Sequence, residues 1–345
     1  MHLRKISLAI AFAASCFFSF NASAVDSGKT TWLWDTSALI STSKTITTAD
    51  KVQINNLIAF CKNKRVTEIY LQINRDIRVE KYQYLVASLG AAQVIVENRS
   101  YPIKVHALDG ADNWITPDGA SNKKAFFDWV FAYQTKANMN QRLAGIHLDV
   151  EPYTSALWRS EVHHDKAIAA YQGFINDAIK RVEDAKSGIG VPARLPGDLP
   201  LSFAIPFWFD GETYIDKAIL PYAYNPSLPL PNNLAEWLYA NTKIAALAVM
   251  TYRDSLEGQG GGMWGVASKD LILGVRYSKK TIVSADVSPV KGTDPTYITF
   301  YEEGEAAMLN VLNGLRTKID NTSATKTAKY AFAIHDYNNW LKIKP

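Results

Sequence analysis

The stretch Gly145–Glu151, with the sequence GIHLDVE, alternates apolar residues with residues that ionise. Successive side chains of a β-strand point to opposite faces, so His147, Asp149 and Glu151 share one face and the three apolar residues share the other. In a barrel of parallel strands the apolar face meets the surrounding helices. The polar face of this strand is therefore predicted to point into the barrel and toward its carboxyl end.

Seven further short runs rich in β-branched and apolar residues lie on either side of this strand. They are Thr31–Asp35, Glu68–Asn74, Lys104–Asp109, Leu201–Phe207, Ala246–Tyr252, Thr281–Val287 and Tyr330–Asp336. Helical patterns such as Lys166–Glu183 and Glu302–Ile319 separate the runs. Strands that alternate with helices predict a parallel sheet, and eight such units predict an α/β fold with a single (β/α)8 TIM barrel. We assign this barrel domain to residues 25–345.

The seventh strand has a competing interpretation, because residues 271–275 are also apolar. We prefer a helix over residues 268–279, since Lys279 and Lys280 then lie at its end and Thr281 begins a β-branched run. The proline-rich stretch Pro221–Pro231 and the glycines of Gly258–Gly262 are expected to form loops over the carboxyl end of the barrel.

The amino-terminus has the three parts of a signal peptide. Arg4 and Lys5 precede the apolar run Ile6–Phe20, and Ala22-Ser23-Ala24 is a small-residue cleavage signal. We expect cleavage before Val25, and a secreted or periplasmic protein. An uncleaved anchor and a lipoprotein signal at Cys16 are the alternatives. No later stretch is long and apolar enough to span a bilayer, so no membrane insertion of the mature chain is expected.

The amino-acid composition limits the kinds of molecule that the protein is expected to bind. The chain of 345 residues has a formal charge of +4, which falls to +2 without the two cations of the signal peptide, and it has no clustered Lys/Arg run. A nucleic-acid partner is therefore not expected. Cys61 is the one cysteine outside the signal peptide, and its apolar helical neighbourhood predicts a buried thiol. The 9 Trp and 17 Tyr suit a site that stacks aromatic rings on sugars, although they also suit ordinary cores.

Polar and aromatic residues gather where the predicted strands end. Barrel enzymes place their chemistry at the carboxyl ends of the strands, so these residues are candidates for binding substrate. They are Trp34, Asp35, Asn74, Asp109, His147, Trp208, Arg253, Asp254, Asp286, His335 and Asp336.

Asp149 and Glu151 are the candidate catalytic carboxylates. Residues two apart on one strand are about 6–7 Å from each other, so the two charges repel and one carboxyl is pushed toward its protonated form. A carboxyl that keeps its proton near neutral pH suits a general acid. The alternative is a structural ion network with Arg253 or Arg142.

The stretch Gly145–Glu151 resembles the strand-four signature Asp-Gly-x-Asp-x-Asp-x-Glu of the family 18 glycoside hydrolases, the chitinase-like barrels. Met250-Thr251-Tyr252 resembles their strand-six motif Met-x-Tyr-Asp. The resemblance implies that Glu151 is the general acid and that Asp149 orients the acetamido group of the substrate. It further implies that Tyr252 hydrogen-bonds the acetamido carbonyl, and that Trp340 matches the aromatic floor of the sugar subsite.

The chain differs from the family pattern at three places. Ala144 and His147 stand where the signature has aspartates, and Arg253 stands directly after Tyr252. Whether the substrate must carry an N-acetyl group therefore stays open. The predicted function is a secreted glycoside hydrolase-like enzyme that acts on a polysaccharide or cell-wall glycan, without cofactor or metal.

Two other functions remain open on the sequence alone. One is a carbohydrate-binding barrel that has lost catalysis. The other is a metal-dependent barrel hydrolase using His147, Asp149, His335 and Asp336, although the chain lacks the strand-one His-x-His pair of common metallo-barrels.

Overall fold

A computed structural model describes residues 28–345 of the chain. The predicted signal peptide, residues 1–24, lies outside the described residues. Among residues 28–345, no helix is long and apolar enough to cross a membrane.

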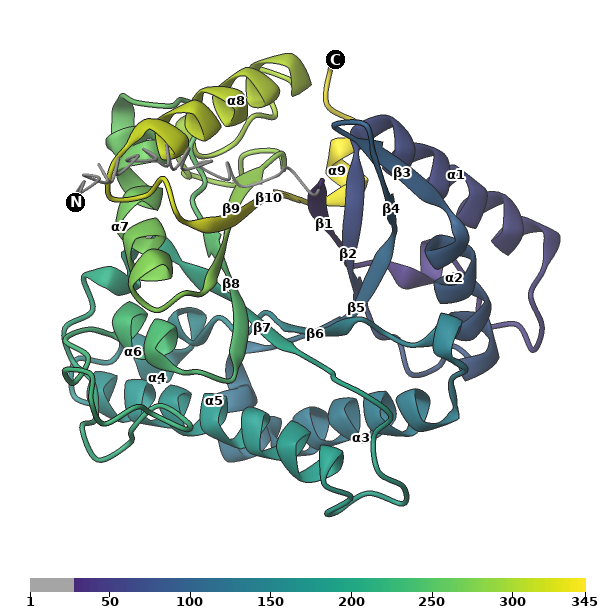
Figure 1. Cartoon of the computed structure of the whole chain (residues 1–345), viewed down its shortest axis with the longest axis horizontal. Helices are drawn as coiled ribbons and strands as arrows, with labels where there is room; N and C mark the ends of the chain where they lie inside the picture. Colours follow the sequence, from purple (N-terminus) through teal and green to yellow (C-terminus); the bar gives the residue numbers. More distant parts are fainter. Residues whose placement is uncertain (1–27) are drawn as a thin grey trace, which may run out of the picture.

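Eight parallel strands close into a barrel, which confirms the predicted fold (Figure 1). The strands follow one another around the barrel in chain order, and the last strand pairs with the first. They are β1 (Lys29–Leu33), β2 (Val66–Gln72), β5 (Lys104–Asp109), β6 (Gly145–Leu148), β7 (Leu201–Pro206), β8 (Ile244–Met250), β9 (Lys280–Asp286) and β10 (Lys329–His335). Each corresponds to a predicted strand, and the preferred interpretation of the seventh is confirmed because residues 271–275 lie in a helix.

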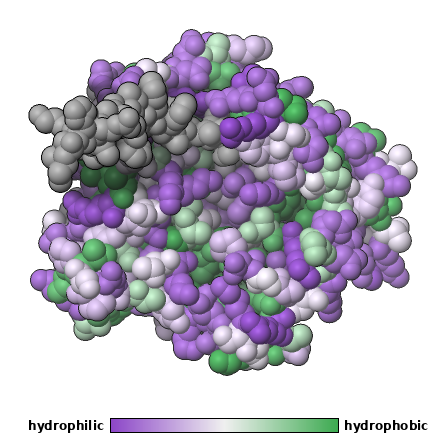
Figure 2. Space-filling model, in the orientation of Figure 1, coloured by the Kyte–Doolittle hydropathy of each residue, from purple (hydrophilic) through white to green (hydrophobic). Residues whose placement is uncertain are grey.

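Helices surround the barrel (Figure 1). They are α1 (Thr48–Lys64), α2 (Val79–Ala91), α3 (Ala120–Lys136), α4 (Ala156–Arg159), α5 (His164–Lys186), α6 (Leu234–Ala240), α7 (Gly262–Arg276), α8 (Glu305–Asn321) and α9 (Tyr337–Trp340). Cys61 is buried on α1 as expected, and burial raises the pKa of its thiol to about 12. On the face that Figure 2 shows, hydrophilic and hydrophobic residues are interspersed.

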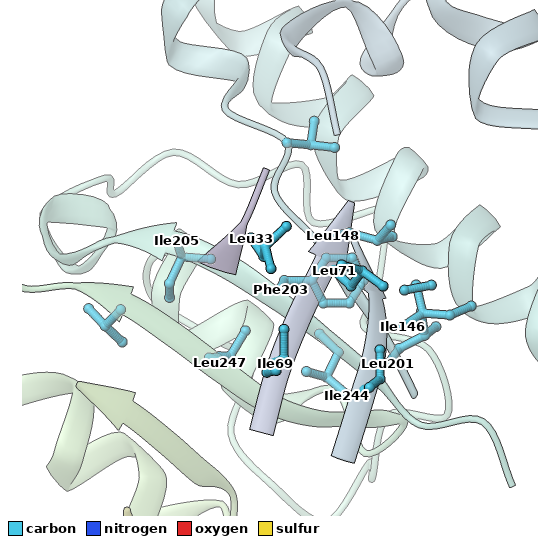
Figure 3. Close-up of a cluster of buried hydrophobic side chains, with 14 of the residues drawn as sticks. Leu33, Ile69, Leu71, Ile146, Leu148, Leu201, Phe203, Ile205, Ile244 and Leu247 are labelled. Carbon is cyan, nitrogen blue, oxygen red and sulfur yellow. The ribbon is translucent and has the colours of Figure 1, made fainter. Parts of the chain in front are cut away.

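The strands separate two apolar cores. Outward-facing residues such as Ile69, Ile146 and Leu148 pack against the helices (Figure 3). Inward-facing residues form a smaller cluster that includes Trp32 and Tyr70 and is otherwise built mainly from small residues such as alanine. The predicted alternation of strand β6 is therefore present, with its apolar side chains toward the helices.

A two-stranded antiparallel hairpin, β3 (Gln93–Val96) and β4 (Arg99–Pro102), lies between α2 and β5 outside the barrel. Its turn residues Glu97 and Asn98 have φ of 48° and 63°. Positive φ at both turn residues is typical of a two-residue hairpin loop. The hairpin was not predicted.

The segment between β7 and α6 does not cover the carboxyl end of the barrel along its whole length, contrary to the prediction. Gln172 and Asn176 of α5 donate to the carbonyls of Ile219 and Leu220, at 3.3 and 2.9 Å. Thr242, at the amino end of β8, donates to the carbonyl of Ala223 at 3.3 Å. The segment therefore descends along α5 and packs on the outside of the barrel, because its backbone carbonyls find donors there.

A buried ion pair fixes the loop between β1 and α1. Asp50 caps α1 by accepting from the backbone of Thr47, and its carboxylate lies 2.8 Å from Lys81 Nζ on α2. Their side chains are 4% and 1% exposed. Lys81 also donates to the Ser41 carbonyl at 2.7 Å and to Ser43 Oγ at 2.8 Å. Burial alone would raise the pKa of Asp50, but the bonds from Lys81 and the backbone lower it well below its usual value.

Gly145, the first residue of β6, has no room for a side chain. A Cβ atom there would lie 2.6 Å from His106 Nδ1 and 2.7 Å from the Pro200 carbonyl oxygen. Gly145→Ala is expected to lower the free energy of unfolding by about 1–3 kcal/mol, because the backbone oxygen has to move. Gly173→Ala on α5 is the control: no neighbour lies within 4 Å, so helix propensity predicts a gain of about 0.5–1 kcal/mol. Urea denaturation measures both, and equal effects would contradict the packing argument.

Candidate active site

The carboxyl end of β6 brings Asp149 and Glu151 to the top of the barrel. Regular pairing ends at Leu148, although the Asp149 amide still donates to the Asp109 carbonyl of β5 at 3.1 Å. Pro152, which lacks an amide hydrogen, then begins a tight turn over Pro152–Thr154. The strand is shorter than predicted for this reason, and the two carboxylates lie on the connection that leaves it.

Asp149 carries the perturbed carboxyl of the pair. Its burial and the neighbouring charge of Glu151 raise its pKa to about 7, while His335 acts in the opposite direction. Its Oδ1 is buried and has no hydrogen-bond partner among residues 28–345. Asp149 therefore holds a proton up to near-neutral pH.

Glu151 accepts a short hydrogen bond from the hydroxyl of Tyr153. The same hydroxyl lies 3.9 Å from the sulfur of Met250, at the end of β8. Burial and the charge of Glu151 raise the pKa of Tyr153, so the phenol keeps its proton and remains the donor. Sequence reasoning missed Tyr153. Its position two residues after Glu151, just past the strand, was the available signal.

Tyr252 lies among the carboxylates of four other residues. Burial raises its pKa well above the usual value, and the charges of Asp286, Asp149, Glu151 and Asp336 add to the effect. The ring centroids of Tyr252 and His335 lie 6.0 Å apart, so the ends of β8 and β10 meet there, and the charges that act on the phenol come from residues at the ends of β6, β9 and β10. Asp336, which follows β10, is also the cap of α9 and accepts from the amide of Asn339 at 3.0 Å.

His335 joins β1, β9 and β10. Its Nδ1 lies 3.0 Å from Asp286 Oδ1, and its Nε2 lies 3.2 Å from the indole nitrogen of Trp34. Burial lowers the pKa of His335, but the bond to Asp286 outweighs it and the pKa is raised. The Trp34 N–H can donate only to an unprotonated Nε2. Protonation of His335 therefore breaks the bond to Trp34.

His147 does not reach this site. Its side chain is 0% exposed and stacks on Tyr70 inside the barrel, with ring centroids 3.6 Å apart. Its Nδ1 lies 2.9 Å from Ser202 Oγ. Burial holds its pKa well below the usual value, so the ring is neutral. The assignment of His147 to substrate binding was wrong, because its place on the inward face is inside the barrel core.

Trp340 does not form the floor of a sugar subsite. It is 2% exposed, packs against Phe60 of α1 with ring centroids 5.1 Å apart, and donates to Glu305 at 3.1 Å. This assignment was wrong because α9 turns the indole toward the outer helices. Trp208 is 37% exposed and stands edge-on to Tyr153, with ring centroids 5.0 Å apart.

The remaining candidates lie at the edge of the site and have local hydrogen bonds. Asp35 accepts from the amide of Ala38 at 3.1 Å. Asn74 bonds Ser37 Oγ at 2.9 Å, and Asp109 accepts from the Gly110 amide at 2.9 Å. Burial raises the pKa of Asp109. The Asp254 amide donates to the Tyr297 carbonyl at 3.0 Å, which ties together the loops after β8 and β9.

Within residues 28–345, no group of three or more His, Cys, Asp or Glu side chains is arranged to hold a metal ion. The chemistry that these residues offer is proton transfer and electrostatic stabilisation by carboxyl, phenol and imidazole groups.

Comparison with known proteins gives distant similarities. No protein-family model and no curated protein matches the sequence. A mutant GH18 chitinase from Cycas revoluta, solved with (GlcNAc)4, shares 11% identity over 90% of this chain and 95% of its own, with a TM-score of 0.44.

Two further solved structures are similar over most of their length. The GH18 chitinase ChiB of Flavobacterium johnsoniae shares 14% identity over 91% of this chain and 89% of its own, with a TM-score of 0.43. The β-mannanase of the blue mussel Mytilus edulis shares 8% identity over 93% of this chain and 90% of its own, with a TM-score of 0.47. At these values the similarities carry no conclusion about activity, and the fold assignment rests on the strand pairing itself.

Proposed function

We propose that this protein is a glycoside hydrolase that acts on a polysaccharide or cell-wall glycan, and that the segment 1–24 exports it. Glu151 is the general acid, and Asp149 and Tyr252 assist. The observation that carries the proposal is the pair Asp149 and Glu151 at the end of β6, in which Asp149 has a pKa of about 7, beside the half-buried Tyr252 side chain.

Each group has a chemical role in this proposal. The proton that Asp149 holds at neutral pH passes through Glu151 to the oxygen of the glycosidic bond as that bond breaks, which leaves Asp149 ionised. The acetamido oxygen of the substrate attacks the anomeric carbon from the same sugar. The Asp149 carboxylate that remains stabilises the positive charge that develops, and Tyr252 donates to the acetamido carbonyl. Water then hydrolyses the cyclised intermediate and restores the proton to the pair. Trp208, exposed beside Tyr153, offers a ring on which a sugar stacks.

A screen of soluble glycans tests the function. Purified wild-type protein is incubated with chitin-, mannan-, glucan- and peptidoglycan-derived oligosaccharides, and products are identified by mass spectrometry. Release of shortened oligosaccharides that requires Glu151 supports the proposal. Absence of turnover on every glycan class, with binding retained, rejects it.

Asp149→Asn and Tyr252→Phe are expected each to lower turnover by tens- to hundreds-fold, using about 2–4 kcal/mol for one preorganised group. The double variant should lose less than the product of the two, because both groups serve one acetamido group. Turnover of the wild type should fall above about pH 7 as Asp149 loses its proton, and Asp149→Asn should remove that limb of the profile. Steady-state kinetics across a range of pH measures the losses in the single and double variants and the shape of the pH profile.

A control variant tests whether the losses are specific to Asp149 and Tyr252. A glycan without an acetamido group tests whether that group is the nucleophile. Asp112→Asn, in the loop after β5, changes a carboxyl that lies off β6 and should leave turnover near normal. Efficient cleavage of a glycan without a 2-acetamido group, with indifference to a thiazoline mimic of the cyclised intermediate, would leave a glycosidase but exclude this mechanism.

One observation favours a second candidate, a carbohydrate-binding barrel without catalysis. The Tyr153 hydroxyl donates to Glu151 and so occupies an oxygen of the carboxyl that the catalytic proposal uses as the acid. Tyr153→Phe discriminates the two functions. If the protein is an enzyme, the kcat of Tyr153→Phe differs from that of the wild type. If it is a carbohydrate-binding barrel, neither the wild type nor Tyr153→Phe releases products, and both bind the glycan equally.

A further inference from the structure

Arg253 is the one arginine or lysine among the residues predicted for the site, whose other charged members are mostly carboxylates. It follows Tyr252 directly, three residues after the end of β8. Its side chain is held by two backbone carbonyls: Nε donates to Gly260 at 3.0 Å, and Nη1 donates to Tyr252 at 2.6 Å. The guanidinium is therefore anchored beside the Tyr252 backbone, at the carboxyl end of the barrel.

Two aromatic rings restrict the same guanidinium. Its central carbon lies 4.8 Å from the ring centroid of Phe207 and 5.4 Å from that of Tyr297. Phe207 follows β7, and Tyr297 belongs to the loop after β9. Cation–π contacts from two neighbouring loops hold the planar group in one orientation before any ligand arrives.

The glycine-rich loop is shaped around this side chain. Gly260 has a φ of 62°, and a Cβ atom there would lie 2.6 Å from Arg253 Nε and 2.8 Å from Tyr297 Cε2. Glycine at this position therefore allows the backbone carbonyl to approach the guanidinium. This gives the loop Gly258–Gly262 a physical role that the proposed reaction does not use.

The charge of Arg253 is left without a partner. Within residues 28–345, no salt bridge joins Arg253 to a carboxylate, and Asp254 interacts with it only at longer range. A guanidinium has five N–H donors, and the two carbonyls leave the others, including both on Nη2, available. A planar fork of free N–H groups matches the two oxygens of a carboxylate.

We propose that Arg253 binds a carboxylate carried by the substrate, so that the site takes acidic glycans in preference to neutral ones. The inference rests on the proposed function, since it names the class of glycan for that same site. Arg253 directly follows Tyr252, on which the charges of Asp149, Glu151 and Asp286 act, so it adds a fixed cation to this acidic end of the barrel. A ring carboxylate of a uronic acid and the lactyl carboxylate of a muramic acid share this chemistry.

Binding to matched ligands tests the inference in the Glu151→Gln protein, which is not expected to consume them. The probes are an oligogalacturonate and an oligomer of alternating N-acetylglucosamine and N-acetylmuramic acid, each as the free acid and as its methyl ester. Calorimetry should show that one acid binds roughly 10- to 100-fold more tightly than its ester, the range for a charged hydrogen bond. The acid that shows the preference identifies the source of the carboxylate.

Variants of the Glu151→Gln protein separate the contribution of the Arg253 guanidinium from that of the glycine-rich loop that holds it. Arg253→Gln should abolish the preference, and Arg253→Lys should keep part of it because the charge remains while the fork is lost. Gly260→Ala should reduce the preference without changing any charge. Arg99→Gln, which removes a cation from exposed β4, is the matched control and should keep the full preference.

Equal binding of acid and ester, no binding of either acid at millimolar concentration, or a preference that survives Arg253→Gln overturns the inference. Carboxylate-dependent binding without cleavage by the wild type supports the inference while the proposed function fails. Cleavage of neutral oligosaccharides with no effect of a carboxylate leaves the proposed function and removes the inference.

Discussion

Glu151→Gln is expected to lower turnover by about 10²- to 10⁴-fold while the glycan still binds, the range typical of general acid catalysis. Glutamine keeps the size of the side chain and can accept the hydrogen bond of Tyr153, but it has no titratable proton. The loss should therefore fall in kcat, with KM nearly unchanged. Steady-state kinetics on the substrate found by the glycan screen measures both constants.

The control for this prediction is Glu161→Gln, the same substitution at an exposed residue before α5. It should leave kcat within experimental error of the wild type. The pH profile provides a second readout, because Asp149 loses its repulsive neighbour in Glu151→Gln and its pKa should fall from about 7. Near-normal kcat in Glu151→Gln would show that another group supplies the proton.

Lys81→Met should lower the free energy of unfolding by about 3–5 kcal/mol, because it leaves the carboxylate of Asp50 buried without its cation. The lysine also donates to Ser41 and Ser43, so the loop after β1 loses its anchor in the same variant. Urea denaturation monitored by circular dichroism measures the change. The matched control is Lys51→Met, which removes an exposed lysine from α1 and should change stability by less than about 0.5 kcal/mol.

The pH dependence of this effect has a definite sign. The pKa of Asp50 is lowered in the folded state, so its pairing stabilises the protein fully above the unfolded value of about 4 and is lost progressively as the pH falls below that value toward the much lower folded pKa. The difference between wild type and Lys81→Met should shrink in the same direction. Asp50→Asn combined with Lys81→Met should cost less than Lys81→Met alone, and a larger cost would contradict the buried-charge explanation.

The barrel was predictable because its strands carry a strong local signal. Runs such as Ala246–Tyr252 and Tyr330–Asp336 are apolar and β-branched or aromatic, and burial on both sides is what a parallel strand requires. The hairpin of β3 and β4 lacks such a signal. Its turn residues Glu97 and Asn98 adopt positive φ, but the turn contains no glycine, which is the residue that usually indicates a turn of this kind.

The site was predictable in its strand positions but not in the direction of each side chain. Asp149, Glu151 and Tyr252 follow from where β6 and β8 end. The places of His147 and Trp340 depend on depth along the strand and on the orientation of α9, which no local pattern encodes. Tyr153 lies beyond the strand, where the turn at Pro152 directs its hydroxyl back to Glu151.

The closure of the barrel places a constraint on how the chain is made. Strand β1 pairs with β10, and Thr31 Oγ1 donates to the Ile334 carbonyl across 303 positions of sequence. A nascent chain therefore carries an open edge on β1 until almost the whole polypeptide has emerged, and contacts this distant in sequence form slowly. A chain that ends between β9 and Lys329 leaves β1 and β9 as two free parallel edges, which can pair with other strands. Premature termination late in synthesis is therefore expected to yield a product that aggregates through these exposed strand edges.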